Sequence, residues 1–450
     1  MYKKIVPTLL LFNIFFSYSQ INTIKYNPVN KDSLIVYINS ISDKKIIQLG
    51  GKNKKEIKNI VNERKTDFIK SINDSSYIFD NNISKYLKTI LNEIYQANPN
   101  INNKDFYFLV NKSPIPNASC YGNGVFSINL GLFNIIESED ELAFIIAHEI
   151  AHFQLEHTDK SLIKYIETVK SKETKSKISN IRRQEFGRTK AYSDLMKNLS
   201  YNFLKRSRKA ETQADSLGLF LFSRTKYNKN ASVSSLKKLE FIDEIVFNED
   251  TKVKSHLNFD DYPFKDNWLN KEEILFDIKE KVDDYAMNKD SLKTHPDIPL
   301  RIDLIQKLIT NSNNNLNTDT AELNKIKKIA AENSISIFLN DSSVDMALYQ
   351  TLIMYNKNQI DQKDYCNILA AILMKTYKIK NNHTFGKYVS PINSFSEEKY
   401  LNEIRIFLHN LELKNVRKIG FNFCKKYKSF MQNDIEFSKV ENFFNTLNLN

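Results

Sequence analysis

Apolar residues recur at helical spacing along most of this 450-residue chain. The clearest stretch is 138–153, where Ser138 and Glu141 have the spacing of a capping box and mark the start of a helix. The apolar positions that follow form one broad face: Leu142, Ile145, Ile146, Ile150 and Phe153. This periodicity predicts a helix that packs against other elements along its length. Similar patterns predict further helices at 54–73, 82–96, 322–339, 344–356, 362–377, 397–413 and 416–431.

Two short segments have the composition of β-strands. Residues 106–110 and 125–128 are rich in aromatic and β-branched side chains. Gly122 and Gly124 lie between them and supply the backbone freedom of a turn or a bulge. We therefore expect an α+β protein that is mainly α-helical and contains a small sheet.

Polar stretches divide the remainder of the chain. Residues 248–267 are expected to form a loop, with His256 at the surface, and the asparagine-rich stretch 310–321 is typical of a linker. The linker separates a first region, residues 20–310, from a C-terminal helical region, residues 322–450. The C-terminal region has no steady 34-residue repeat, so we predict only an appendage of helical hairpins there.

The first residues have the pattern of a secretory signal peptide. Lys3 and Lys4 precede an apolar run at 5–16, and small residues follow before a cleavage site after Ser19. The run is too short to cross a bilayer comfortably, and no later segment has 18 uninterrupted apolar residues. We expect residues 1–19 to be removed and the mature protein to be exported and soluble.

The predicted helix at 138–153 contains the sequence His148-Glu149-Ile-Ala-His152. Histidines four residues apart lie on one helical face, about 6 Å apart along the axis, so both imidazoles can bind one tetrahedral zinc ion. Glu149 follows the first histidine and can reach a water on that ion to accept its proton. The small apolar residues of this segment favour a buried functional helix over a charged surface turn.

A hydrolytic zinc site needs a third protein ligand and leaves its fourth position for water. The candidate is Glu211, on a second predicted helix. Asp215 lies one turn later and can accept the free N–H of a ligating histidine, which fixes its tautomer. Two rivals lie on the first helix. Glu156 would have to reach back past His152, and His157 is displaced around the helix and is expected to make a local polar contact.

Residues 158–210, between the two motifs, carry most of the chain's positive charge. They contain 15 Lys and Arg against five Asp and Glu, so this insert has a net charge of +10, compared with +12 for the whole chain. It can be a solvated helical hairpin, a lid over the cleft around Gly187, or a patch attracted to anionic membrane, to outer-membrane assembly components or to other acidic partners. Export argues against a nucleic-acid partner.

Three cysteines are too few for a disulfide framework. An oxidising compartment permits one bond, and Cys366–Cys424 is the expected pair because both residues lie in the C-terminal region. Cys120 would then be a free thiol that contributes to packing.

Four motifs in order resemble the M48 family of zinc metallopeptidases. They are His148-Glu-x-x-His152, Glu211-x-x-x-Asp215, the segment that begins at Asn117, and Thr294-His295-Pro296 followed by Arg301. The resemblance covers roughly residues 75–310, and within the family the chain resembles the exported BepA-like members. It implies a zincin-like fold with a small edge sheet, and a C-terminal tetratricopeptide-like array.

The same resemblance assigns roles residue by residue. It implies that His148, His152 and Glu211 bind one zinc ion, that Glu149 is the general base and that Asp215 orients a ligand. His295 corresponds to a histidine near the catalytic water, where it would stabilise an oxyanion or occlude the metal; its alternative is a capped turn before Pro296. Arg301 corresponds to a structural or oxyanion-side partner. Ser119 and Cys120 depart from the family's usual Asn-Ala-Phe-Ala, which changes the adjoining subsite.

These residues favour an exported zinc endopeptidase, periplasmic by analogy with its relatives, that cuts unfolded or misassembled envelope or secreted proteins. Such a substrate can add as a strand along Val125, Phe126, Ser127 and Ile128. The alternative is a zinc-stabilised chaperone or scaffold that binds clients through its C-terminal helices while its site is closed or idle. The presence of Glu149 favours the enzyme, because zinc can remain bound without that residue.

Overall fold

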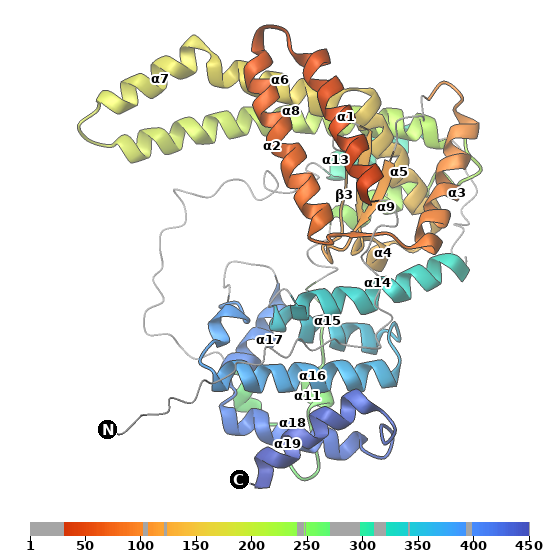
Figure 1. Cartoon of the computed structure of the whole chain (residues 1–450), viewed down its shortest axis with the longest axis vertical. Helices are drawn as coiled ribbons and strands as arrows, with labels where there is room; N and C mark the ends of the chain where they lie inside the picture. Colours follow the sequence, from red (N-terminus) through yellow and green to blue (C-terminus); the bar gives the residue numbers. More distant parts are fainter. Residues whose placement is uncertain are drawn as a thin grey trace, which may run out of the picture.

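The computed structural model describes residues 31–101, 107–120, 124–240, 247, 249–270, 298–309, 321–340, 343–392 and 398–449. It confirms a mainly helical α+β fold with one small sheet (Figure 1). The predicted signal peptide, Gly122, most of the 310–321 linker and His295 lie outside the described residues. None of the described helices is long and apolar enough to cross a membrane.

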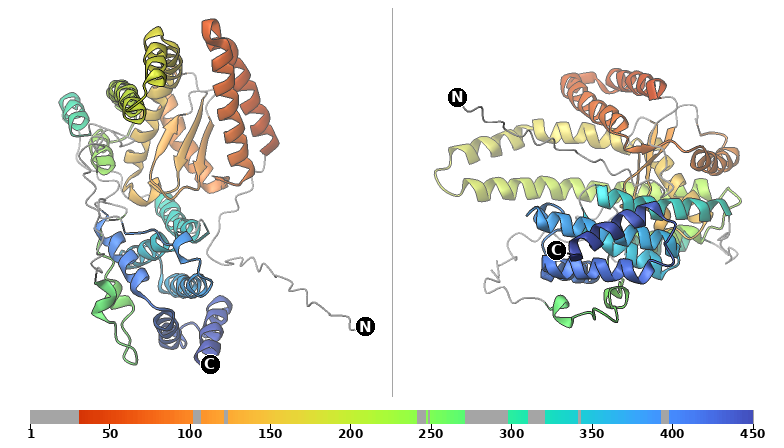
Figure 2. Two further views of the ribbon diagram at one scale, coloured as in Figure 1. Left: turned by 90° about the vertical axis from the view of Figure 1, so that its left-hand side faces the viewer. Right: turned by 60° about the horizontal axis from the view of Figure 1, so that its bottom comes forward.

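The N-terminal half is a three-layer arrangement around the sheet (Figure 2). The strands are β1 (Tyr77–Ile78), β2 (Tyr107–Asn111), β3 (Ala118–Cys120) and β4 (Val125–Asn129), in the order β1-β2-β4-β3. The β2–β4 pair is parallel and the other two pairs are antiparallel. One sheet face packs on a helical hairpin, α1 (Lys31–Leu49) and α2 (Lys54–Asn73), joined by the 3-10 turn η1 (Gly51–Asn53).

The opposite face of the sheet packs on the helices that carry the predicted site. These are α3 (Asn81–Ala97), α4 (Leu132–Ile135), α5 (Glu139–Gln154), α8 (Arg188–Phe222), α9 (Ala231–Glu240) and α13 (Ile298–Leu308). Helices α5 and α8 pack most closely at Gly218, where an added Cβ would lie 2.9 Å from the Cα of His148. A glycine at this crossing lets the backbones of the two site helices approach each other.

The basic insert forms a helical arm that projects from the body (Figure 1). It consists of α6 (His157–Lys170), α7 (Lys172–Arg183) and the first half of α8. Gly187 has a left-handed conformation, with φ of 74°, at the turn between α7 and α8. The tip of the arm points away from α5, so the structure favours the hairpin interpretation over a lid.

The C-terminal half is a bundle of helices with its own core. Its elements are α14 (Ala321–Asn340), α15 (Val344–Asn356), α16 (Gln362–Asn381), η4 (Phe385–Lys387), α17 (Lys399–Asn410), α18 (Leu413–Tyr427) and α19 (Ile435–Leu449). Helix α14 is shared, because its Leu323, Ile326 and Ala330 pack into the core around α5. Residues 249–270, with α11 (Val253–His256) and η2 (Asp266–Leu269), pack into this core through Leu257, Phe264 and Trp268. The boundary predicted at 310 is therefore wrong for 249–270, because these apolar side chains are buried against α15–α18.

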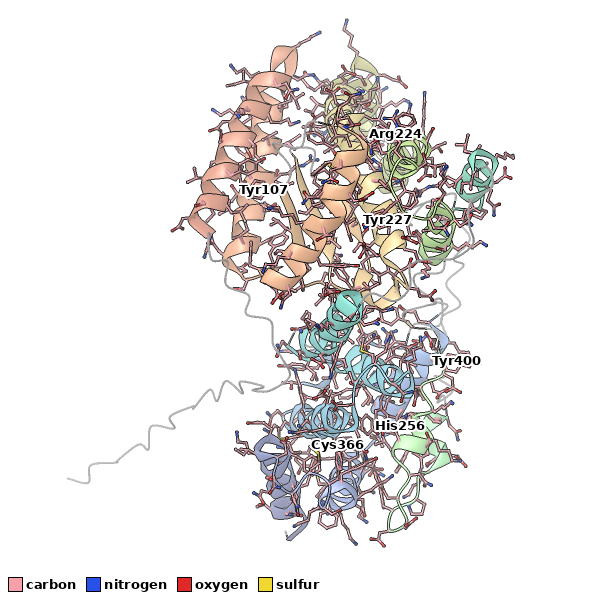
Figure 3. The ribbon with its side chains drawn as sticks, turned by 90° about the vertical axis from the view of Figure 1, so that its right-hand side faces the viewer. Tyr107, Arg224, Tyr227, His256, Cys366 and Tyr400 are labelled. Atoms are coloured by element: carbon pink, nitrogen blue, oxygen red, sulfur yellow. The ribbon has the colours of Figure 1, made fainter. Side chains whose placement is uncertain are left out.

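Two further expectations about the C-terminal half are also wrong (Figure 3). His256 is buried, and its ring nitrogens lie 2.9 Å from the Tyr365 hydroxyl and 3.0 Å from Asn356 Oδ1. Cys366 and Cys424 are free thiols within the same apolar core. Burial raises the pKa of both thiols to about 12, which keeps them neutral.

Candidate metal centre

The start of α5 is held by an extended network of hydrogen bonds. Ser138 Oγ accepts from the backbone N–H of Glu141 at 3.2 Å, as the capping box predicts. The Glu141 carboxylate accepts from the N–H of Glu137, and it also binds Ser234 and Lys238 of α9 at 2.7 Å each. These contacts fix the position of α5 against α9 before the helix reaches its two histidines.

His148, His152 and Glu211 offer three ligand atoms that all lie within 4.8 Å of one another. The two Nε2 atoms are 3.0 Å apart, and the Glu211 carboxylate oxygens lie 3.6 Å from His148 Nε2 and 3.3 Å from His152 Nε2. Ligands at about 2.0–2.1 Å from a tetrahedral zinc ion are separated by about 3.3 Å. The spacing and the His-His-carboxylate donor set therefore fit a zinc ion with a fourth position left for water.

Asp215 and Arg301 support two of these ligands. Asp215 Oδ1 lies 3.0 Å from Nδ1 of His148, so an ionised Asp215 holds a proton on Nδ1 and leaves Nε2 free to bind a metal. Arg301 is almost fully buried and donates to both Asp215 oxygens at 2.6 and 2.8 Å. It also pairs with Glu211 at 3.0 Å, so one guanidinium orients both carboxylates.

His157 supports the other histidine ligand. Its Nδ1 lies 2.9 Å from Nδ1 of His152, and its Nε2 lies 3.3 Å from Oε1 of Gln213 on α8. An amide oxygen only accepts, so His157 donates from Nε2 and accepts from His152 at Nδ1. This leaves Nε2 of His152 with a lone pair. The two lone pairs that face each other 3.0 Å apart need a cation or a proton between them.

Burial and the neighbouring charges shift the pKa values of His148 and His157 in opposite directions. Burial by itself lowers the pKa of His148, but Asp215 and Glu211 outweigh it and raise the pKa to about 10. Burial, followed by the charge of His152, lowers the pKa of His157 to about 4, which keeps its imidazole neutral as an acceptor. A metal ion must therefore displace a proton from His148, because only a neutral imidazole binds it.

Glu149 lies beside the ligand cluster and is buried. It lines a small, mainly apolar cavity together with His148, Arg301 and Ala118 of β3. Leu236 and Leu239 of α9 also line this cavity. This arrangement brings a carboxylate, a metal ligand and the edge of the sheet together, which is what proton transfer next to a bound peptide requires.

The remaining residues that were predicted to form the site are not part of the described ligand cluster. Glu156 adopts a left-handed conformation between α5 and α6 and pairs with Lys160, away from the ligand cluster. His295 lies outside the described residues. A substrate cannot add as a strand along Val125–Ile128 as predicted, because β4 is paired on one edge with β2 and on the other with β3. Among the described strands, β3 instead lies at the end of the sheet beside α5.

Sequence reasoning missed two residues that shape the centre. Gln213 lies between Glu211 and Asp215 in the chain and was overlooked because a glutamine two residues from a ligand has no distinctive spacing. Gly218 follows Asp215 by three residues; a glycine within a helical pattern indicates a close packing partner, and that signal could have identified it.

Comparison with known proteins agrees with this geometry. The profile of peptidase family M48 matches residues 82–309, about half of the chain. A segment of 133 residues is 29% identical to the mitochondrial metalloendopeptidase OMA1 of Arabidopsis thaliana, and it covers 29% of this chain and 25% of that relative. The chain thus spans about a quarter of the relative's length. With the matched residues enclosing the His-His-Glu cluster, the chain belongs to peptidase family M48, a family of metallopeptidases.

Proposed function

We propose that this protein is a zinc-dependent endopeptidase in which Glu149 is the general base. The observation that carries the proposal is the His148, His152 and Glu211 cluster with tetrahedral spacing, next to the buried carboxylate of Glu149. Zinc held there would polarise the scissile carbonyl and lower the pKa of water. Glu149 takes a proton from the attacking water and delivers it to the leaving amine. Asp215 and His157 hold the tautomers that keep both Nε2 atoms available.

The substrate is proposed to lie along β3. The N–H of Asn129 donates to the carbonyl of Asn117 at 2.8 Å, and Ser119 is paired with Ser127. In an antiparallel pair, successive residues direct their peptide groups alternately toward and away from the partner strand. Ala118 and Cys120 therefore direct theirs to the edge of β3 that no described strand pairs, and Ala118 lines the same cavity as His148 and Glu149. An extended peptide paired with Ala118 would place its backbone beside the ligand cluster.

Strand addition reads the backbone, so unfolded or misassembled proteins are the substrates that this site would accept. The signal-peptide pattern at residues 1–19 supports export, and by analogy with exported relatives we propose a periplasmic location. Envelope and secreted proteins are then the available substrates. OMA1, the relative named above, is a mitochondrial protein, so its location does not transfer to a chain with this leader.

The tip of the basic arm is proposed to contact an anionic membrane surface. Phe186 is 88% exposed at the tip, between Arg182 and Arg183 at the end of α7 and Arg188 at the start of α8. An exposed aromatic ring among cations is the composition of a segment that binds anionic headgroups. We expect sedimentation with phosphatidylglycerol vesicles but not with phosphatidylcholine vesicles, and a weaker association for Phe186→Ser. Equal recovery with both lipids would contradict the membrane partner.

The activity is tested by incubating purified residues 20–450 with an unfolded protein and measuring zinc content in parallel. Glu149→Gln should retain zinc and lose cleavage by a factor of at least about 100, the usual contribution of a general base. Glu156→Gln is the matched control, because that carboxylate is exposed and pairs only weakly with Lys160. Cleavage by the wild type and the control alone supports the enzyme. If the wild type holds zinc and cuts nothing, the endopeptidase proposal fails and client binding by the scaffold alternative becomes the next measurement.

A further inference from the structure

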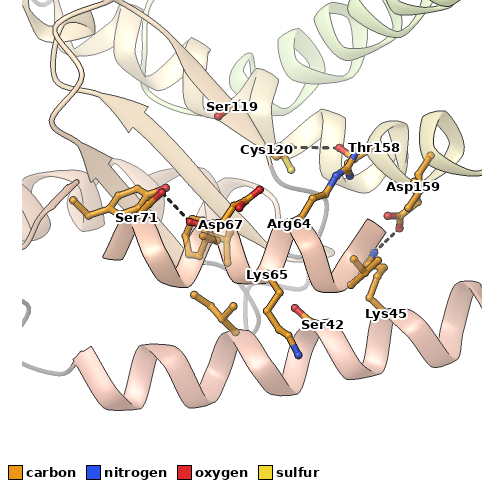
Figure 4. A pocket seen from close by; sticks show the side chains of 16 residues that line it. Ser42, Lys45, Arg64, Lys65, Asp67, Ser71, Ser119, Cys120, Thr158 and Asp159 are labelled. Carbon is orange, nitrogen blue, oxygen red and sulfur yellow. Dashed lines mark hydrogen bonds and ion pairs between the residues drawn. The ribbon is translucent and has the colours of Figure 1, made fainter. Parts of the chain in front are cut away.

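A second and much larger cavity lies beside β3, the described strand at the end of the sheet (Figure 4). Its volume is about 490 Å³, within the size range of sites that bind small molecules or peptide segments. Helices α1 and α2 form one wall, and β1, β3, β4 and the start of α6 form the other. The hairpin α1–α2 precedes residues 82–309, so this wall does not come from the part of the chain that matches the M48 profile.

Both apolar and charged side chains line this cavity. The apolar side chains come from both walls: Ile38, Val61, Phe68, Tyr77, Val125 and Leu162. Lys45 is paired with Asp159, so these two charges largely offset each other. Arg64, Lys65 and Asp67 add a small positive excess. This composition suits bulky apolar groups attached to a polar backbone more than it suits a highly charged ligand.

The large cavity lies next to the proposed substrate path, because neighbouring residues of β3 line it and the small cavity. Ser119 and Cys120 of β3 line it, whereas Ala118 lines the small cavity at His148 and Glu149. Two residues of a strand span about 7 Å, so a peptide paired with Ala118 reaches the large cavity within a few residues. The carbonyl of Cys120 already accepts from the Thr158 hydroxyl at 3.3 Å. Thr158 thus occupies one of the two acceptor positions of this carbonyl, so we expect strand pairing to weaken at Cys120 and a longer substrate to leave the strand there.

We propose that the cavity beneath the α1–α2 hairpin is a substrate subsite that binds two or three residues of the polypeptide with bulky apolar side chains, two to four positions from the scissile bond. The proposal rests on the endopeptidase function. The subsite would give a sequence preference to an active site that otherwise recognises only the backbone of its substrate. Exposed apolar segments are what distinguishes an unfolded protein from a folded one, so this subsite would also select for unfolded substrates.

The experiment fills the cavity with a side chain from its own wall. Ser42 of α1 is buried and lines the cavity, and Ser42→Trp places an indole inside it. Ser40→Trp, on the exposed face of the same helix, is the matched control. Val61→Phe fills the cavity from α2 and replaces Ser42→Trp if that variant does not fold. Zinc content and melting temperature are measured for each protein.

Two peptides with the same cleavage site are compared, one with leucine or phenylalanine and one with serine two to four positions away. The wild type and Ser40→Trp should prefer the apolar peptide by at least about tenfold in kcat/KM, and Ser42→Trp should lose this preference. Binding of the labelled peptides to zinc-loaded Glu149→Gln protein gives the same comparison without turnover. Equal preference in the filled and control variants, with both proteins folded, overturns the subsite. If the wild type binds selectively but does not cut, the endopeptidase function fails while the subsite stands.

Discussion

Gly218→Ala tests whether the close crossing of α5 and α8 sets the geometry of the metal centre. The new Cβ would lie 2.9 Å from the Cα and 3.1 Å from the N of His148, whereas ordinary contacts begin at 3.4 Å. Both neighbouring atoms belong to the backbone, so no side chain can rotate away to make room. The two helices must separate by about 0.5 Å at this point.

Two opposing effects on stability can be estimated for this substitution. Overpacking a helix contact costs about 1–3 kcal/mol, and replacing glycine by alanine within a helix returns about 1 kcal/mol. The free energy of unfolding should therefore fall by only about 0–2 kcal/mol. Metal ligands tolerate displacements of about 0.2 Å, and Glu211 lies two turns from Gly218 on α8. We expect zinc affinity to fall at least about tenfold, a larger effect than the change in stability.

Zinc affinity is measured by competition with a chelator, and stability of the metal-free protein by urea denaturation. Gly386→Ala is the control, because an added Cβ at that glycine meets nothing within 4 Å. It should change stability by less than about 0.5 kcal/mol and leave zinc affinity unaltered. Wild-type zinc affinity in Gly218→Ala would refute the reasoning, because the ligands would then not depend on the crossing distance.

Four further outcomes follow from contacts in the structure. Arg301→Met should lower the free energy of unfolding by about 3–5 kcal/mol, measured in urea, because it leaves two buried carboxylates without their cation; a loss below about 1 kcal/mol would contradict this. His157→Ala should weaken zinc binding about 10–100-fold by removing the acceptor that orients the second histidine ligand, and unchanged chelator competition would exclude that role. Burial, followed by the nearby Asp364, raises the pKa of Glu332 to about 7 from an ordinary 4.5. Its contribution to stability, up to about 3 kcal/mol, is present below pH 4.5 and lost as the pH rises through 7, so Glu332→Gln should flatten the stability profile between those values. Because Cys366 and Cys424 are free thiols, the melting temperature should be the same with and without a reductant, and a drop on reduction would indicate a bond between them.

The elements predicted best from the sequence are those whose local pattern and packing agree. Helix α2 has the predicted bounds, 54–73, and α15 has the predicted bounds, 344–356. The α5 start was predictable because Ser138 and Glu141 act within one turn of the chain. The pairing of His148 with His152 was also predictable, because residues four apart lie on one face of a helix. Glu211 was identified from its motif, but its place beside the histidines depends on the packing of α8 on α5.

Other features depend on contacts that no local pattern encodes. Helix α1 was missed because its apolar residues do not all lie on one face. Val36 and Ile47 are 68% and 78% exposed, so the amphipathic pattern of the face that packs on the sheet is weak. The position of β4 within the sheet depends on β3, and the three residues of β3 do not have a strand-like pattern that identifies them from the sequence. His256 is buried only because 249–270 packs on α15 and α16, far away in the chain. In each case the deciding interaction is long-range.

Helix α8 connects the arm tip to the metal centre without interruption, over 35 residues or about 52 Å. If it turns as a lever on the Gly218 contact, the tip at Arg188 lies about 45 Å from the fulcrum and Glu211 about 10 Å. A sideways displacement of the tip would thus produce a displacement of Glu211 that is more than four times smaller. The arm can shift by about 1 Å on a surface while Glu211 stays within the tolerance of a metal ligand, but a 5 Å deflection would carry that carboxylate about 1 Å away and open the site.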